Sequence, residues 1–533
     1  MNKTNKIFQH TLRGLGILLV VLLIFVLLSP VLINMDPVKD KILTYLSEKT
    51  EGKLLYKKVD ILYFPRPHAV IHQAIVSLPG DFKGKIARLN VYPAIFPLFT
   101  GDVRIKKLRI RTPNLELKLP LRENKRNEQT NTLLIQPVKK ALIDSCKYFL
   151  ANLPNTAIQI QNGSLTIYDE SRSVFNFQNI NAHTKISAKK IKIDLMGKSN
   201  LWKNIAVNGW INPQIFTYKG QVSVTHFSPK KLTDFIFPDT DWKIADGDIN
   251  FDLDFQSYQP NLVRARVQCR KSHLTWLHGD DKIAIKATRL MCKLDMDDER
   301  TQVYLSNLTL GYPKLSASGQ LILNRLTDQI SLDIDAKKLD VGSTRKVALT
   351  LAENKGITKN IFDIVRNGEI PEISFKSFGK SLADLGKLEN IFLKGKLRDG
   401  NIFVPTALLD LKDVNGNVTL TNGVLLGENI TSRLGNSYGQ NGILKLGFDK
   451  HIPYYVETNI QADLAQLPPI LKRLVKYKPF LKELSKIKHV NGSALGKMVL
   501  DGSTQSVDVS VNASQINLRG RYGRIPYSLR ING

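Results

Sequence analysis

Alternation of apolar and polar residues with a period of two runs through most of the body of the chain. The clearest case is the segment 248–255, in which Asp and Asn alternate with the apolar residues Ile249, Phe251, Leu253 and Phe255. Successive side chains of a β-strand point to opposite faces of a sheet, so this segment predicts a strand with one apolar and one polar face. The same pattern recurs at 330–334, 418–420 and 507–511. The predicted fold class is therefore mainly β.

Asn-Gly and Asp-Gly pairs recur along the same part of the chain and predict tight turns. A type I′ turn needs positive φ at both central residues, which Asn, Asp and Gly adopt most readily. Because apolar alternation continues on both sides of Asn162-Gly163, we expect a β-hairpin there. The other pairs begin at positions 208, 246, 367, 399, 415, 422, 441, 491 and 501, and some of them can belong to longer loops. The pattern predicts a long antiparallel meander.

The apolar face of such a sheet has to be covered by a second layer. The helical stretches after residue 150 are too few to cover so many strands. Two arrangements satisfy the pattern: two sheets packed as a sandwich, or one sheet whose apolar face forms an open groove filled by acyl chains. Burial of each lipid CH₂ group is worth about 0.8 kcal/mol, so a groove can compete with water for a lipid with two acyl chains. The pattern alone leaves both arrangements open.

The N-terminal region contains an apolar run from Leu15 to Ile33 without a charged residue. At about 1.5 Å per helical residue, this run just spans a hydrocarbon core of about 30 Å. A cleaved signal peptide is the alternative, but its apolar region is usually only about 7–15 residues long and precedes an Ala-x-Ala-like site, which is not found here. The basic residues Lys3, Lys6 and Arg13 before the run favour a cytoplasmic N-terminus. We expect a single-pass anchor, with the body on the far side of the membrane.

Helical patterns are confined to a few other segments. Asp36-Pro37 is a suitable helix start and Gly52 a suitable end. Apolar residues spaced by three or four predict a second helix over 133–150, after a polar linker at 122–132. The predicted organisation is a cytoplasmic N-terminus (1–13), an anchor (14–33), an α+β region (34–120), a linker with a helix (121–152) and a repetitive β-body (153–533) with helical insertions near 342–367 and 463–488.

Basic residues concentrate in the second helical insertion, where Pro468-Pro469 and Pro479 open two short helices. A solvated helix face is the ordinary explanation for such a charge pattern. Contact with an anionic membrane surface is the alternative, because basic amphipathic helices are attracted to anionic lipids. The residues that would make this contact are Lys472, Arg473, Lys476 and Lys482.

The chemically reactive residues form no recognisable catalytic or metal-binding motif. Cys146, Cys269 and Cys292 are too widely spaced for a disulfide framework or a CxxC site. His68 and His72 would lie about 13 Å apart along one strand face, too far to share a metal, and are read as surface residues. The glycine-rich segment 435–442 lacks the Lys-Ser/Thr of a phosphate-binding loop. We expect no enzyme activity, no cofactor and no metal.

The chain carries 76 Lys and Arg against 47 Asp and Glu, a formal net charge of +29. A charge of this size suggests nucleic acid or an anionic lipid surface as the partner. Because the expected anchor places the body outside the cytoplasm and the charge is spread along the chain, the sequence predicts no nucleic-acid partner. A basic surface facing anionic phospholipid or lipopolysaccharide fits this compartment.

Four short motifs follow the apolar run. They are T-x-G-K at 50–53, F-P-R-P at 64–67, P-L-x-x-G-x-V at 97–103 and P-x-L-x-L at 113–117. Together with the anchor, they resemble the N-terminal region of AsmA-like proteins. The segments 408–442 and 481–503 resemble the repeated β-units of the larger YhdP-like members of that family.

The resemblance implies an inner-membrane-anchored periplasmic protein of diderm bacteria, akin to bridge-like lipid-transfer proteins. It implies a long curved antiparallel sheet whose apolar groove carries phospholipids toward the outer membrane. Because Ile249, Phe251, Leu253 and Phe255 alternate strictly with Asp and Asn, we expect them to form part of the lipid-facing wall. The alternative function is a structural or assembly factor that supports envelope integrity or outer-membrane proteins, which would then be its partners. Large members are longer, and Asn532-Gly533 resembles a turn before another strand, so we expect either a fragment or a short member.

Overall fold

The computed structural model consists of two units, both built mainly of β-strands, which confirms the predicted mainly β fold. Unit 1 comprises residues 1–235 and 252–260, and unit 2 comprises residues 236–251 and 261–533. The structure describes residues 44, 53–62, 64, 66–78, 82–100, 102–119, 144, 146–147, 150–151, 153–169, 172–236, 242–259, 261–278, 281–351, 356–404, 409–447, 454–475, 477–502 and 507–532.

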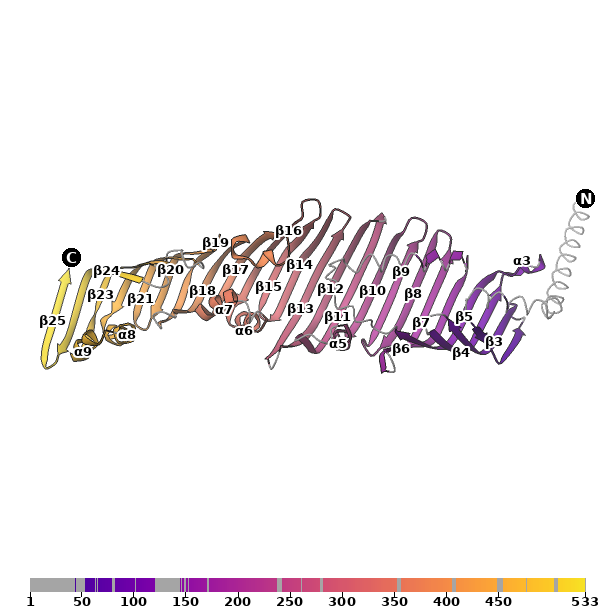
Figure 1. Cartoon of the computed structure of the whole chain (residues 1–533), viewed down its shortest axis with the longest axis horizontal. Coiled ribbons are helices and arrows are strands. Elements are labelled where there is room, and N and C mark those ends of the chain that lie inside the picture. Colours follow the sequence, from indigo (N-terminus) through magenta and orange to yellow (C-terminus); the bar gives the residue numbers. More distant parts are fainter. Residues whose placement is uncertain are drawn as a thin grey trace, which may run out of the picture. The chain divides into compact units, whose positions relative to one another are not determined.

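The described strands of unit 1 form a single sheet in which β1 and β2 both pair with β3 and the later strands follow in chain order (Figure 1). The strands are β1 (Lys53–Leu55), β2 (Lys58–Leu62), β3 (His68–Leu78), β4 (Phe82–Pro93), β5 (Ile105–Leu119), β6 (Ala157–Asp169), β7 (Arg172–Ser187), β8 (Lys190–Ser199), β9 (Asn204–Asn212) and β10 (Thr217–Phe227). Helix α3 (Ile95–Phe99) precedes β5, and α5 (Lys230–Ile236) follows β10. The next strand, β11 (Trp242–Gln259), contributes residues to both units.

The described strands of unit 2 also belong to one sheet, in which β12 to β25 pair antiparallel in chain order (Figure 1). The strands are β12 (Leu262–His278), β13 (Asp281–Met296), β14 (Arg300–Tyr312), β15 (Leu315–Asn324), β16 (Gln329–Asp340), β17 (Val365–Gly379), β18 (Ile391–Val404), β19 (Leu409–Thr421), β20 (Val424–Leu434), β21 (Ser437–Gly447), β22 (Tyr454–Asp463), β23 (Ile487–Gly502), β24 (Val507–Tyr522) and β25 (Ile525–Asn532).

The helices of unit 2 are short and lie between strands. They are α6 (Val341–Leu351), α7 (Gly356–Ile364), α8 (Leu467–Leu474) and α9 (Lys478–Lys486), with the 3₁₀ turns η1 (Asp384–Gly386), η2 (Leu388–Asn390) and η3 (Leu464–Gln466). Val341 at the start of α6 is buried against Leu397 and Val414, so the first insertion is anchored on β18 and β19.

One pair of neighbouring strands is parallel, which corrects the prediction of an entirely antiparallel sheet. Lys107 of β5 pairs with Ala157 of β6, and Leu119 pairs with Asp169, so the two strands run in the same direction. Parallel neighbours need a crossover of a dozen or more residues instead of a tight turn. The chain between Leu119 and Ala157 supplies this length, and its residue Cys146 is buried with Ile186 and Ile191 of the same unit.

Nine of the ten Asn-Gly and Asp-Gly pairs lie inside strands, so the hairpin predicted at Asn162-Gly163 is wrong. Strand β6 continues through this pair, where Asn162 has a φ of 51° and the register with β7 shifts between Ile160 and Gly163. The pair supplies the positive φ of a β-bulge instead of a turn. Asn422-Gly423, which joins β19 to β20, is a tight turn as predicted.

Bulges on neighbouring strands lie side by side within each sheet. In unit 1, residues with positive φ lie in β3, β5, β6 and β7 at Gln73, Thr112, Asn162 and Asn179, and the register shifts of a bulge occur at the last two. In unit 2, they interrupt β17 to β21 at Gly368, Asp399, Asp413, Asn429 and Asn441. A bulge adds one residue to a strand and bends it. Aligned bulges therefore bend each sheet along a line that crosses its strands.

No helix in the described ranges is long and apolar enough to cross a membrane. The expected anchor (14–33), the segment before it, the helix start at Asp36-Pro37 and the linker 122–132 all lie outside the described residues. In the helix expected over 133–150, the described residues 144, 146, 147 and 150 are helical. The division of the chain at residues 120 and 152 stays a prediction.

Candidate functional site

One face of the unit 1 sheet, called the inner face below, is apolar from strand to strand. The pairing register joins one row of nine residues across β2 to β10: Val59, Ile71, Leu89, Ile110, Ile160, Ala182, Leu195, Val207 and Val222. The adjacent row on the opposite, outer face is polar at every position but one: Asp60, Val70, Asn90, Arg109, Gln159, His183, Asp194, Asn208 and Gln221. The sheet therefore separates an apolar surface from a polar one.

Unit 2 has the same two-faced organisation. Its inner-face row crosses β12 to β21 through Val267, Cys292, Leu305, Gly319, Ile334, Phe375, Leu393, Leu420, Leu425 and Leu446. The adjacent outer-face row begins with Arg266, Lys293, Tyr304, Gln320, Asp333 and Lys376. Near the last strands, Val509 and Val511 of β24 continue the inner face opposite Leu500 and Met498.

The bulges keep each strand's apolar residues on the inner face over its whole length. In β6 the inner positions are Ile158 and Ile160 before the bulge, and Leu165 and Ile167 after it. The step across the bulge at Asn162 is one residue longer than strict alternation allows. At such a bulge, successive inner-face positions are three residues apart instead of two, with Asn, Asp or Gly between them. This spacing is the signal in the sequence for a bulge, and the hairpin prediction overlooked it.

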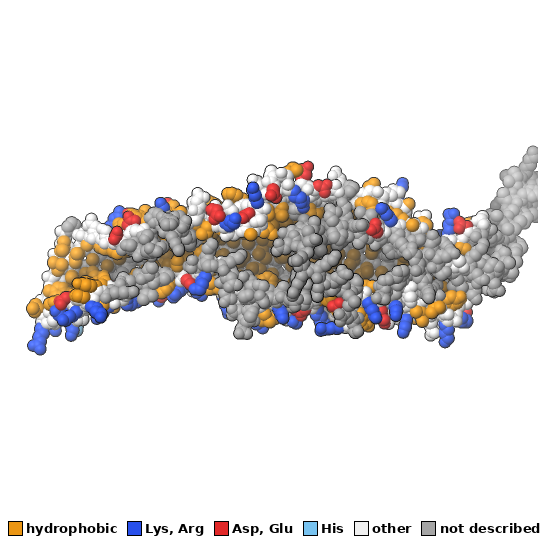
Figure 2. Space-filling view, in the orientation of Figure 1, with side chains coloured by type: hydrophobic (Ala, Val, Ile, Leu, Met, Phe, Trp, Pro, Cys, Tyr) orange, Lys and Arg blue, Asp and Glu red, His pale blue; other side chains and the backbone are white. Residues whose placement is uncertain are grey.

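The exposure of side chains on the inner face varies widely, from fully buried to mostly exposed. Ile71 is fully buried and Ile186 is 1% exposed, whereas Val509 and Val511 are 65% and 60% exposed. Leu150 packs against the cluster around Ile186, so a helical segment covers part of unit 1. No second sheet packs on the described strands, which excludes the sandwich for this part of the chain. Figure 2 shows the uncovered hydrophobic side chains in a hollowed face toward the end that carries β23 to β25.

The predicted lipid-facing residues Ile249, Phe251, Leu253 and Phe255 are half-buried positions of β11. Ile249 and Phe251 belong to unit 2, and Leu253 and Phe255 to unit 1. In unit 1, the Phe255 ring lies over Gly220 of β10, and its centroid is 6.0 Å from that of Tyr218. Gly220 and Tyr218 share the inner face with Val222, so Phe255 extends that face. Asp252 points the other way and accepts a hydrogen bond from the Ser223 hydroxyl at 2.6 Å.

Tyr218 reports on the local polarity of this surface. Burial raises the pKa of its phenol above the usual value, with a smaller opposing effect from the Ser257 hydroxyl. Burial likewise raises the pKa of the Cys146 thiol, which packs against Ile186 and Ile191. Both shifts have the direction that burial in apolar surroundings produces.

Gly220→Ala should destabilise unit 1, because an ideal Cβ would lie 2.5 Å from Cζ of Phe255. Moving the ring off its contact should cost about 1–3 kcal/mol in unfolding free energy. Gly386→Ala is the control, since nothing lies within 4 Å of a Cβ at that position. Chemical denaturation of the two variants measures the difference in unfolding free energy. Equal stabilities would contradict the placement of Phe255 over Gly220 on the inner face.

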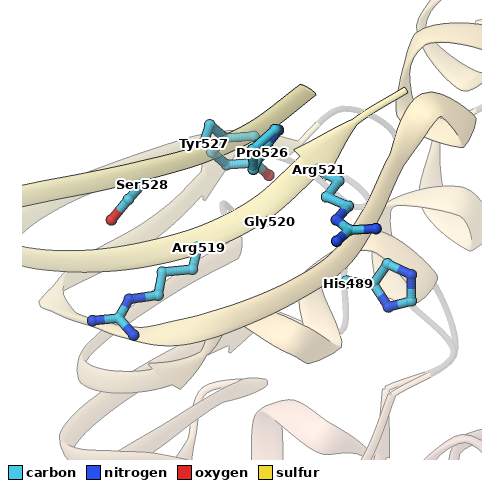
Figure 3. A pocket seen from close by; sticks show the side chains of 7 residues that line it. All are labelled: His489, Arg519, Gly520, Arg521, Pro526, Tyr527 and Ser528. Carbon is cyan, nitrogen blue, oxygen red and sulfur yellow. The ribbon is translucent and has the colours of Figure 1, made fainter. Parts of the chain in front are cut away.

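A basic depression lies at the ends of β23 to β25, on the sheet of unit 2 (Figure 3). It has a volume of about 390 Å³, and its lining residues are His489, Arg519, Gly520, Arg521, Pro526, Tyr527 and Ser528. The register places Arg519 opposite Asn491 and Arg521 opposite Lys488, with His489 on the bulge between these two partners. Sequence reasoning missed this cluster because His489 and the arginines are about 30 residues apart and only strand pairing brings them together.

The predicted membrane-contact residues lie on the helices that precede this depression. Lys472 and Arg473 are exposed in the last turn of α8, and Lys482 is exposed on α9. Lys476 lies outside the described residues. The structure thus brings three of the four residues to one helical pair, and their contact with a membrane stays a prediction.

The histidines near the start of unit 1 have structural partners. His68 is buried, which differs from the expected surface position, because its ring stacks on Tyr92 at 4.6 Å and its Nδ1 lies 2.8 Å from the Arg66 carbonyl oxygen. Nε2 of His72 is 3.2 Å from the Asp60 carboxylate. Within the described ranges, no group of three or more His, Cys, Asp or Glu side chains could hold a metal ion.

Comparison with known proteins gives a family match. A search of curated proteins found no match to the chain. The model of the AsmA family matches residues 1–311, more than half of the 533 residues, and this range includes the motifs at 50–117 and the β-body up to β13. With its two-faced sheet of successive strands and its matching sequence, the chain belongs to the AsmA family.

Proposed function

We propose that the protein is a non-enzymatic carrier that moves phospholipids between the inner and outer membranes along the inner face of its sheets. The observation that carries this proposal is the apolar row that crosses β2 to β10 in unit 1 and, with Gly319 as one gap, β12 to β21 in unit 2. Membership of the AsmA family suggests an association with the cell envelope, and it supports phospholipid over a soluble apolar ligand.

The length of the row favours a track over a single binding pocket. Neighbouring strands are about 4.8 Å apart, so the nine-strand row of unit 1 extends for roughly 40 Å. One acyl chain fills about half of a ~30 Å hydrocarbon core, so more than one chain fits end to end along the row. Burying about ten CH₂ groups contributes about 8 kcal/mol, enough to hold a lipid without a covalent or ionic bond.

The polarity of the two faces supports a carrier exposed to water. The outer face carries ion pairs such as Lys376 with Asp333, whose charged atoms are 3.2 Å apart. In this proposal, residues 14–33 hold the protein in the inner membrane, the outer face meets the aqueous periplasm, and the inner face shields acyl chains.

A photo-crosslinking experiment with matched positions on the two faces tests the proposal. A benzophenone side chain replaces Val222 or Val511 on the inner face, and Gln221 or Ser510 on the outer face, in the full chain in native membranes. We expect phospholipid adducts at the two inner positions and few at the outer ones, read by mass spectrometry. Equal labelling on both faces contradicts the carrier, and an inner face without lipid favours the structural or assembly factor.

A further inference from the structure

Helices α8 and α9 lie with the turn between β24 and β25 at one edge of the unit 2 sheet (Figure 1). The backbone N–H of Gly523 donates to the Lys486 carbonyl oxygen at 2.8 Å. The Tyr522 hydroxyl donates to the Glu483 carboxylate. These contacts hold α9 against the strand ends. We call this surface, formed by α8, α9 and the β24–β25 turn, the basic edge.

Positive charge at the basic edge is almost uncompensated. Residues 467–486, which contain both helices, include six Lys and Arg residues and one acidic residue, Glu483. Glu483 is already engaged, because Nζ of Lys486 lies 2.7 Å from its carboxylate and, with the Tyr522 hydroxyl, lowers its pKa. Lys472, Arg473 and Lys482 are exposed and have no ion pair with any described residue.

The depression at β23 to β25 continues this charge onto the sheet. Lys488, two residues after the end of α9, pairs in register with Arg521. No acidic residue occurs in β24 after Asp508 or anywhere in β25. Arg519 and Arg521 therefore face solvent without a carboxylate partner among the described residues. A single guanidinium group binds phosphate oxygens through two parallel hydrogen bonds. Figure 3 shows the Arg521 side chain on the side of His489, whereas Arg519 extends away from both.

Large apolar and aromatic side chains are exposed among these charges. Tyr477 is 67% exposed and Ile525 is 69% exposed. Others on the same surface are Leu467, Phe480 and Tyr522, all at least 39% exposed. Aromatic residues next to Lys and Arg are typical of surfaces at the headgroup level of a bilayer, where the rings enter the interface and the cations meet phosphate.

We propose that the basic edge docks on the headgroup region of an anionic phospholipid bilayer. Charge complementarity selects this occupant: the exposed cations of α8 and α9 meet the negative surface potential, and the depression receives a headgroup phosphate beside Arg521 and His489. The inference concerns a different surface from the inner face and does not depend on the carrier function.

Vesicle co-flotation of the full chain, held in phosphatidylcholine nanodiscs, tests the docking surface. The vesicles contain phosphatidylcholine alone or phosphatidylcholine with phosphatidylglycerol. We expect binding to the anionic vesicles only, lost between 0.1 M and 1 M salt as the screening length falls from about 10 Å to about 3 Å. Replacing Lys472, Arg473 and Lys482 together by Glu should weaken binding by about a hundredfold, since each basic residue at an anionic surface is worth roughly fivefold.

The matched control replaces Lys394, Lys396 and Lys412 by Glu, which changes the net charge equally at exposed outer-face positions of β18 and β19. Equal weakening in the two variants, or equal binding to both kinds of vesicle, overturns the inference. Displacement of the vesicles by inorganic phosphate at matched ionic strength also overturns it, because the depression would then be a site for free phosphate. Phospholipid crosslinking at Val222 in the same variants measures lipid on the inner face separately. Failure of the docking proposal can therefore be distinguished from failure of the carrier proposal.

Discussion

Val511→Asp should lower phospholipid transfer by about a hundredfold while the protein stays folded. Val511 lies on the inner face of β24 opposite Met498 and is 60% exposed, so a carboxylate there can be hydrated when no lipid is present. When an acyl chain passes, the charge loses its water without gaining a partner, which costs several kcal/mol. The measurement is transfer of a fluorescent phospholipid between vesicles, with thermal melting of the same preparation.

Ser510→Asp is the matched control for this variant. It adds the same charge one residue earlier on the same strand, and Ser510 is exposed on the outer face opposite Val499. We expect transfer within about twofold of the unmodified protein and an unchanged melting temperature, as for surface substitutions in general. If both variants lose transfer equally, the net charge of the strand matters and the apolar track does not.

The two-faced sheet could be predicted from the sequence because strand alternation is a local property. The side chains of β11 from Ile249 to Phe255 obey a strict period of two. In the structure these residues lie on one strand, but the intervening Asp248, Asn250 and Asp252 are half-buried as well, so the period predicts the strand and not the extent of burial. The face to which each side chain points is decided by the strand itself, so no knowledge of its neighbours is needed.

The bulges could not be predicted by the same reasoning, because they break the period that the reasoning relies on. At Asn162 the apolar pattern shifts by one residue, and a hairpin and a bulge both use an Asn or Gly with positive φ at such a point. Only pairing distinguishes them: β6 continues beside β5 and β7 on both sides of Asn162. The parallel pairing of β5 with β6 could not be predicted either, because it depends on the side of β5 to which the chain returns after the crossover.

The basic edge could be predicted from the sequence only in part. The helices and their charges could be predicted, since Pro468-Pro469 and Pro479 mark both helix starts and the lysines follow in sequence. The depression could not, because Arg519 approaches His489 only through the register of β23 with β24. Local patterns therefore identify faces and helices, and sites that join distant strands emerge only from the fold.

Ile71→Asp should have the largest effect on stability, because it places a carboxylate where the inner face is fully covered. Ile71 is 0% exposed and packs in a cluster with Leu89 and Leu108. A buried carboxylate without a partner costs several kcal/mol, so the melting temperature of unit 1 should fall by about 10 °C or more. Ile71→Val is the conservative control, with an expected loss of about 0.5–1.5 kcal/mol.

Comparing Ile71→Asp with Val511→Asp shows whether a charge on the inner face has a different effect where that face is buried and where it is exposed. Both add one carboxylate to the apolar side of a sheet, but only Ile71 is sealed by packed neighbours. A protein core should fail by unfolding, and an open groove should fail by losing lipid. If Ile71→Asp melts normally, the covered region around β3 and β4 is not a closed core. If Val511→Asp unfolds instead, the exposed part of the face serves stability, and its assignment as a lipid track is wrong.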